Sequence, residues 1–271
     1  MRAVTTSDIR PGLDGIRFAF GTLTVLPVRV TRWDRASARA GMLWAPLAGL
    51  VVGLCAAAAG GLLLLLGAGP LLAAVASAAV PALLTRGLHL DGLADTADGL
   101  GSGKPAEDAL RIMKQSDIGP FGVITLLFAL LAQVAALYQL YGEAGWARGM
   151  AAAVLAGTLA RLALTLASRT GVPAARPEGL GAVVAGTVPA RWALTAGASV
   201  VAACAGAGAL FGPWPGLYGA GHHALAAVVA LGVSHLLLRR CVRRFGGVTG
   251  DVFGAVAETA ATAALVALTL G

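Results

Sequence analysis

The stretch Arg86–Gly103, RGLHLDGLADTADGLGSG, is a polar island between long apolar runs. If its middle is helical, Asp91, Asp95 and Asp98 share one face of the helix, within about 60° of one another. Three carboxylates in such an arrangement repel one another, so the pattern favours a bound cation. Ligands that are all oxygen atoms favour a hard ion, Mg²⁺ or Mn²⁺. The alternative is a solvated acidic helix end.

The composition around this island is that of an integral membrane protein. Of the 271 residues, 58% are hydrophobic and only 12% are charged, and the mean hydropathy is +0.81. Soluble globular domains contain about 25% charged residues. We therefore predict an all-α fold, a polytopic membrane helix bundle that forms a single domain over residues 1–271.

The apolar runs indicate about seven transmembrane helices preceded by an amino-terminal arm. The arm, residues 1–40, is rich in arginine. Its apolar part, residues 15–28, is too short for a span, so we expect an amphipathic segment in the membrane interface. The expected spans are residues 42–66, 71–85, 121–141, 146–167, 192–211, 223–238 and 252–270.

The charge distribution predicts which side of the membrane each loop faces. If the loops alternate, the arm and residues 86–117, 168–191 and 239–251 share one side, and together they hold 18 of the 20 Lys and Arg residues. The positive-inside rule makes that side the cytoplasm. Loops that face anionic lipid also explain the net charge of +7, so nucleic-acid binding is not expected. Polar chemistry on one face favours a cytosol-facing enzyme over a cation transporter, which needs polar groups accessible from both sides.

The segment 239–251, RRCVRRFGGVTGD, is a second candidate site loop. A glycine-rich turn that opens a helix near its end exposes backbone N–H groups that suit phosphate, and arginines beside it can add bidentate contacts. Most of the 38 glycines are expected to pack spans together, so glycine alone leaves the question open. The candidate phosphate-binding residues are Arg243, Arg244, Gly246, Gly247, Thr249, Gly250 and Asp251.

Arg111 and Lys114 form a third basic group, one helical turn apart. They can hold an anionic substrate, or they can extend toward the headgroups from the membrane interface. Spacing does not separate these two possibilities.

Two charged residues, Arg161 and Glu258, fall inside expected spans, where an unpaired charge is costly. Both lie about two turns, roughly 10 Å, from the cytoplasmic end of their span. A salt bridge between them is therefore feasible. The alternative is that Glu258, seven residues after Asp251 on the same helical face, serves the site.

Three motifs carry a resemblance to a known family: LHLDGLADTADG at 88–99, RIMKQSDIGPFG at 111–122 and GGVTGDVFGAVAE at 246–258. They resemble the membrane cobalamin synthases, the adenosylcobinamide-GDP ribazoletransferase family. Shorter matches occur in the family's order, so the resemblance covers most of the chain: TVLPV at 24–28, WAPLAGLVVG at 44–53 and ARPEGLG at 175–181.

The resemblance implies an enzyme of the bacterial or archaeal inner (cell) membrane whose site faces the cytoplasm. It implies that α-ribazole, or its 5′-phosphate, is joined to adenosylcobinamide-GDP with release of GMP, using a divalent metal. Residues 246–251 would form the second motif, and Val25 departs from the basic residue that many members carry. In the acidic motif, Asp91, Asp95 and Asp98 would bind Mg²⁺, and His89 would be the base.

Two other functions stay open at this point. A CDP-alcohol phosphatidyltransferase also carries aspartates on cytoplasmic helix ends, but its pattern places Gly-x-x-Ala-Arg after the second aspartate, whereas Asp91 is followed here by Gly92-Leu93-Ala94-Asp95. A cation transporter could use the same carboxylates as an entry site. The sequence leaves open a homo-oligomer and the form of ribazole that is preferred.

Overall fold

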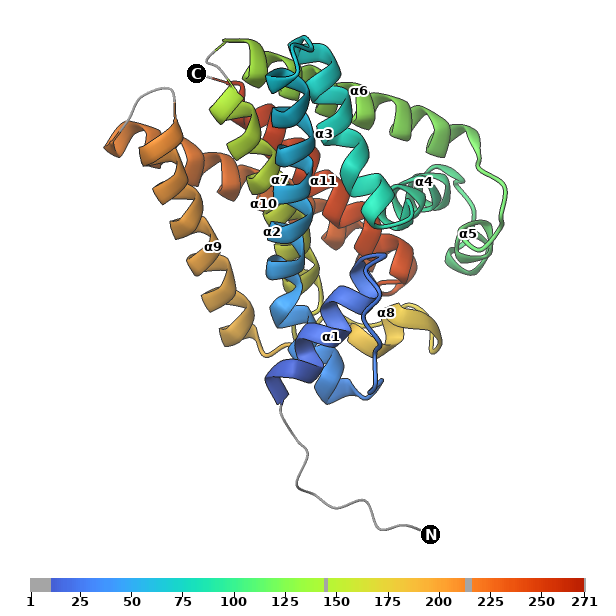
Figure 1. Cartoon of the computed structure of the whole chain (residues 1–271). Helices are drawn as coiled ribbons and strands as arrows, with labels where there is room; N and C mark the ends of the chain where they lie inside the picture. Colours follow the sequence, from blue (N-terminus) through green and yellow to red (C-terminus); the bar gives the residue numbers. More distant parts are fainter. Residues whose placement is uncertain (1–10, 144–145, 213–215, 271) are drawn as a thin grey trace.

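The computed structural model describes residues 11–143, 146–212 and 216–270 (Figure 1). These residues form helices and no β-strand, which confirms the all-α prediction. Residues 1–10 of the predicted arm lie outside the described residues. The helices are α1 (Pro11–Leu23), α2 (Arg35–Leu65), α3 (Pro70–Leu84), α4 (Leu88–Gly101), α5 (Ala106–Ile112), α6 (Pro120–Glu143), α7 (Trp146–Ala167), α8 (Gly179–Val184), α9 (Ala190–Phe211), α10 (Leu217–Phe245) and α11 (Gly250–Leu268).

Six helices are each long and apolar enough to cross a membrane, namely α2, α6, α7, α9, α10 and α11. A seventh crossing requires α3 and α4 to be counted together as one broken span. The predicted polytopic bundle of about seven spans is therefore confirmed. Within it, 72% of the apolar window of α7 is buried in protein against 11% for α9, so α7 is central and α9 faces outward.

The centre of the bundle is the contact between α2 and α7, two neighbouring helices in Figure 1. A Cβ atom placed on Gly49 would lie 2.3 Å from the carbonyl oxygen of Gly157, and one on Gly157 would lie 2.7 Å from the carbonyl oxygen of Gly49. Only glycine permits so close an approach of two backbones. The small residues of these spans thus set how closely the helices pack.

Helix α1, in the predicted arm, packs against the bundle, and its expected place in the membrane interface stays a prediction. Phe18 and Ala19 are fully buried, and Phe18 packs against Gly41 of α2. The loop that follows α1 is held by a hydrogen bond from the Val25 N–H to the Leu84 carbonyl oxygen, 2.7 Å. This bond fixes the arm beside the end of α3.

A sharp bend separates α3 from α4 and places the acidic helix. Arg86 and Gly87 both adopt left-handed backbone conformations, with φ of 53° and 70°. Two such residues in succession end a right-handed helix, and the axes of α3 and α4 differ by 87°. The Gly87 N–H donates to the Ala82 carbonyl oxygen at 2.8 Å, which closes the last turn of α3. Helix α4, with 14 residues, is outside the six single-helix spans and packs against α11 and α6.

The salt bridge that matched depths made feasible for Arg161 and Glu258 is not formed directly. Both side chains are buried, 2% and 8% exposed, yet no ion pair links them in the described part of the chain. Glu258 instead accepts a hydrogen bond from the Gln133 side-chain N–H at 3.1 Å. Arg161 and Glu258 line one internal cavity of about 30 Å³, so they face each other across it. A cavity of this volume has room for a water molecule.

Candidate active site

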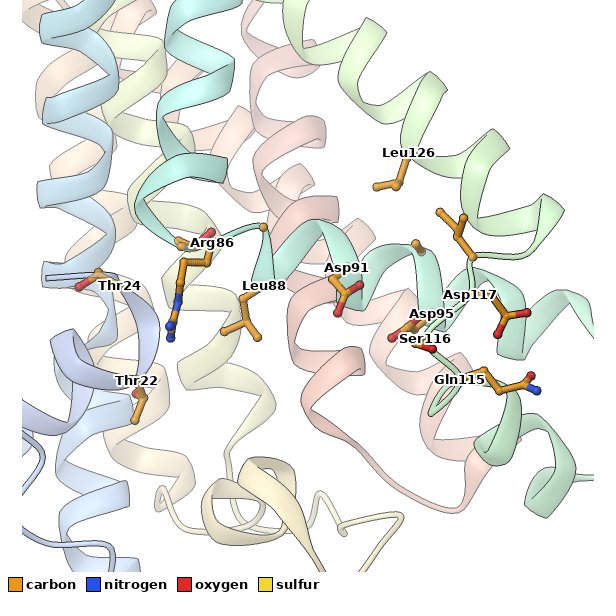
Figure 2. A pocket seen from close by; sticks show the side chains of 14 residues that line it. Thr22, Thr24, Arg86, Leu88, Asp91, Asp95, Gln115, Ser116, Asp117 and Leu126 are labelled. Atoms are coloured by element: carbon orange, nitrogen blue, oxygen red, sulfur yellow. The ribbon is translucent and has the colours of Figure 1, made fainter.

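A large cavity of about 750 Å³ lies at the start of α4. Three segments that are distant in sequence form it: the end of α1, the bend with α4, and the loop between α5 and α6 (Figure 2). Its size suits a nucleotide-sized ligand. The lining residues are Thr22, Thr24, Thr85, Arg86, Gly87, Leu88, Asp91, Ala94, Asp95, Gln115, Ser116, Asp117, Ile118 and Leu126.

Asp91 and Asp95 both line this cavity, as their spacing of one helical turn predicts. The electrostatic setting of Asp95 is unfavourable for a bare carboxylate. Its burial, followed by the negative charges of Asp91, Asp251 and Asp98, raises the pKa of Asp95 to about 7. A place where one more negative charge is this costly is a place where a cation is stabilised.

Asp98 lies on the same helical face as Asp91 and Asp95 but does not line the cavity. It is 6% exposed, and its two oxygens accept the backbone N–H groups of Gly119 at 2.8 Å and Gly122 at 2.9 Å. The spacing places Asp98 correctly on the helix face, but the start of α6 covers that end of α4. Asp98 thus holds α6 on α4, and this geometry gives no support to its predicted metal role.

His89 lies away from the large cavity. Its side chain is 3% exposed and lines a separate cavity of about 110 Å³, together with Asp91 and Asp251. Burial, together with the positive charge of Arg161, lowers the pKa of His89 well below its usual range. The Nδ1 atom has no hydrogen-bond partner among the described residues. The buried imidazole lines the smaller cavity and lacks direct access to a substrate in the large one.

The second motif connects α10 to α11 and starts α11 as predicted. Gly246 ends α10 with a φ of 77°, and a Cβ on Gly247 would lie 2.5 Å from the Ala174 carbonyl carbon. Thr249 caps α11, since its hydroxyl oxygen accepts the Val252 N–H at 3.3 Å. The glycines thus fit a turn against the 173–175 segment, and the predicted phosphate contact of this turn stays a prediction.

Asp251, at the start of α11, joins the acidic helix through a close contact between backbones. A Cβ on Gly92 would lie 2.6 Å from the Asp251 carbonyl oxygen, so α4 and α11 touch at this point. Arg176 approaches the side-chain carboxylate of Asp251, with 4.0 Å between its guanidinium nitrogen and the Asp251 Oδ2 atom. The Arg176 guanidinium also donates a hydrogen bond to the Leu110 carbonyl oxygen. Arg176 thereby ties the 168–190 loop to α5 beside the carboxylates.

The predicted basic residues do not line the large cavity. Arg111 pairs with Asp108 of its own helix at 2.9 Å, and Lys114 pairs with Glu178 at 2.8 Å. Arg244 donates to the Lys104 carbonyl oxygen, and Arg243 is exposed. Lys114 and Arg244 thus contact neighbouring loops, whereas Arg111 contacts its own helix. Substrate contacts by Arg111, Lys114, Arg243 and Arg244 stay predictions without support from this geometry.

Two basic residues that the sequence did not single out lie at the site instead. Arg86 lines the large cavity directly, and Arg176 lies beside Asp251. The motif ARPEGLG contained the signal for Arg176, and the polar island began at Arg86. Thr22 and Thr24 also line the cavity, which places the end of the arm at the site.

The contact between α4 and α11 leads to a first testable prediction. Gly92→Ala is expected to destabilise the protein by about 1–3 kcal/mol and to lower its activity, because the new methyl group meets backbone that has no room to move. Gly232→Ala, inside α10, is the matched control, since a Cβ there meets nothing within 4 Å. Thermal unfolding and activity of the two variants measure the difference. Equal behaviour of the two variants would contradict the close contact.

The donor set fits Mg²⁺ in one particular way. In the described part of the chain, no group of three His, Cys, Asp or Glu side chains is arranged to hold a metal ion by itself. Asp91 and Asp95 nevertheless offer two carboxylates in one cavity. Mg²⁺ is commonly held by one or two carboxylates together with substrate phosphates and water. The residues therefore fit an ion that binds together with a phosphorylated substrate.

A family model and several named relatives match most of this chain. A family model described as cobalamin-5-phosphate synthase matches residues 15–269. An adenosylcobinamide-GDP ribazoletransferase of Frankia casuarinae is 44% identical over 263 residues, which cover 94% of each chain. Proteins with the same name from Nocardioides sp. and Bradyrhizobium diazoefficiens are 40% and 37% identical and cover 94% of this chain.

No solved structure matches the chain. The family model, however, extends from within α1 to the end of α11 and so includes every residue of the cavity. The three relatives each match over 92% or more of their own length. This chain belongs to the cobalamin-5-phosphate synthase family.

Proposed function

We propose that this protein joins α-ribazole, or α-ribazole 5′-phosphate, to adenosylcobinamide-GDP and releases GMP. The observation that carries the proposal is that Asp91 and Asp95 line one nucleotide-sized cavity in a member of this family. Family membership favours this reaction over CDP-alcohol phosphatidyl transfer and over cation transport.

In the proposed reaction, the 3′-hydroxyl oxygen of the ribazole forms a bond to the phosphorus on the cobinamide side of the diphosphate. The bond from that phosphorus to the oxygen of GMP breaks, and the hydroxyl proton is released. Such transfers need charge neutralisation and in-line positioning, and little other chemistry from the protein.

Asp91 and Asp95 would hold Mg²⁺, which when bound neutralises charge on the diphosphate and on the departing GMP. Arg176, near Asp251, adds a positive charge on the α11 side of the carboxylates. Asp117 lines the same cavity from the loop before α6 and forms no ion pair within the described residues. We assign acceptance of the hydroxyl proton to Asp117 rather than to the buried His89.

The purified protein tests this proposal directly. GMP release from adenosylcobinamide-GDP is expected to require both a ribazole acceptor and Mg²⁺, and EDTA should abolish it. GMP release that is independent of any acceptor would indicate hydrolysis, and no release under any condition would refute the proposed reaction.

The proposed cytoplasmic orientation of the site gives a second prediction. In a background without the three native cysteines, single cysteines at Lys104 and Arg243 are expected to resist an impermeant thiol reagent in intact cells. Both positions are exposed, so lysis should make them react. A cysteine at Leu217, which is 93% exposed at the start of α10, is the control expected to react before lysis. Labelling of Lys104→Cys or Arg243→Cys in intact cells would reverse the topology.

A further inference from the structure

The two ends of the large cavity differ in charge. Asp91, Asp95 and Asp117 supply carboxylates, whereas Arg86 is the one basic side chain among the described residues that line the cavity. Figure 2 shows the Arg86 guanidinium extending from the bend on the side where Thr22 and Thr24 lie, away from the end where Asp95 and Asp117 lie. The cavity therefore offers separate places for a metal-bound group and for a second anion.

Arg86 is held in an uncommon conformation and its charge is not neutralised by the protein. Its φ of 53° makes it the one non-glycine residue with positive φ among the described residues. Strained backbone of this kind is concentrated at functional sites. Arg86 is exposed and forms no ion pair within the described part of the chain. Its guanidinium is thus available to a ligand.

At the end of the cavity near Arg86, the threonine hydroxyl groups already donate to backbone carbonyl oxygens, so Arg86 is the side-chain donor available to a ligand. Thr22 and Thr24 each donate their hydroxyl proton to a carbonyl oxygen of α1 at 2.6 Å. Thr85 donates its proton to the Pro81 carbonyl oxygen at 2.9 Å. A ligand here therefore contacts three hydroxyls whose protons are already donated and one guanidinium with five N–H donors. This arrangement favours an anion such as phosphate.

Resting on the proposed function, we propose that Arg86 is the residue that binds the 5′-phosphate of α-ribazole 5′-phosphate. Arg86 precedes Asp91 by five residues and Asp95 by nine. Asp91 and Asp95 lie on α4, which begins at Leu88, whereas Arg86 lies in the bend that precedes this helix. The diphosphate is served by Asp91, Asp95 and Arg176, and the ribose of the acceptor separates its 5′-phosphate from the attacking 3′-hydroxyl. The anion that Arg86 binds is thus the 5′-phosphate of the acceptor. The alternative is that Arg86 binds the phosphate of the departing GMP.

Kinetics with two acceptors distinguish these sources. With saturating adenosylcobinamide-GDP, Arg86→Gln is expected to lower kcat/KM for α-ribazole 5′-phosphate by about tenfold to hundredfold, mainly through KM. The value for unphosphorylated α-ribazole should change little, because that acceptor has no phosphate to lose. Arg86→Lys keeps the charge and should retain part of the activity. Arg39→Gln is the matched control, since Arg39 is an exposed arginine of α2 outside the cavity and should affect neither acceptor.

Equal losses with both acceptors would assign Arg86 to the diphosphate or GMP and overturn the inference, and so would no loss with either. If Arg86→Gln does not fold, inorganic phosphate serves as a probe of the wild-type protein and of Arg86→Lys. It should compete with α-ribazole 5′-phosphate, more weakly in Arg86→Lys; absence of competition overturns the inference. A wild-type protein inactive with both acceptors refutes the proposed function, which is a different outcome.

Discussion

Asp95→Asn is expected to lower the rate of GMP release by about 10²–10³-fold or more, while membrane insertion and folding are retained. The change removes one of the two proposed Mg²⁺ ligands without changing side-chain volume, and losses of this size follow when a single charge-stabilising group is removed from an active site. Initial rates over a Mg²⁺ titration measure the effect. Near-normal turnover at saturating Mg²⁺ would remove Asp95 from the metal site.

The stability of Asp95→Asn separates a catalytic role from a structural one. Asp95 has a folded-state pKa raised to about 7, so its ionised form is disfavoured by folding. The stability that its protonated form contributes is full below the unfolded pKa of about 4 and is lost as the pH rises through 7. At pH 8 without Mg²⁺, Asp95→Asn is therefore expected to unfold at the same or a higher temperature than the wild type.

Asp108→Asn is the control for this experiment. It makes the same chemical change on the exposed side of α5, where Asp108 pairs with Arg111. Exposed ion pairs contribute about 0–1 kcal/mol, so neither activity nor stability should change much. A marked fall in the melting temperature of Asp95→Asn alone would show that Asp95 is required for the fold.

Glu258→Leu is expected to destabilise the protein by about 3–5 kcal/mol, the loss typical when one member of a buried charge pair is removed. The substitution leaves the Arg161 guanidinium buried without a compensating charge. Arg161 has no hydrogen-bond partner at Nε and Nη2 among the described residues, so it depends on Glu258 across the small cavity. Thermal unfolding in detergent measures the loss.

Arg161→Met is expected to have a comparable effect, and the double variant should recover part of the sum. Two apolar side chains in place of a charge pair leave no stranded charge, so the effects of the two changes should not add. Leu137→Met, which changes the lining of the same cavity without changing charge or much volume, is the control. If the single variants are too unstable for unfolding experiments, folded yield after extraction gives the same comparison. Strictly additive losses would show that the two charges do not interact.

The site was predictable from the sequence only where it depended on one helix. Asp91 and Asp95 line one cavity because their spacing places them on one helical face, whatever surrounds that face. Asp98 is on that face too, but Gly119 and Gly122 cover it, and nothing in α4 encodes this contact. Arg86, rather than Arg111, enters the cavity because two successive left-handed residues redirect the chain between α3 and α4.

The sequence by itself determined the helices and their membrane setting. A backbone in lipid must satisfy its hydrogen bonds locally, so an apolar run of sufficient length has to be a helix. The starts of helices were predicted less well. The first span was expected to begin at residue 42, but α2 begins at Arg35, because the Asp34 carboxylate accepts the Ala36 and Ser37 N–H groups. Only the tertiary structure decided which side chains meet. The Gly92–Asp251 contact and the cavity between Arg161 and Glu258 join residues far apart in sequence, and such neighbours follow from how closely whole helices pack rather than from local spacing.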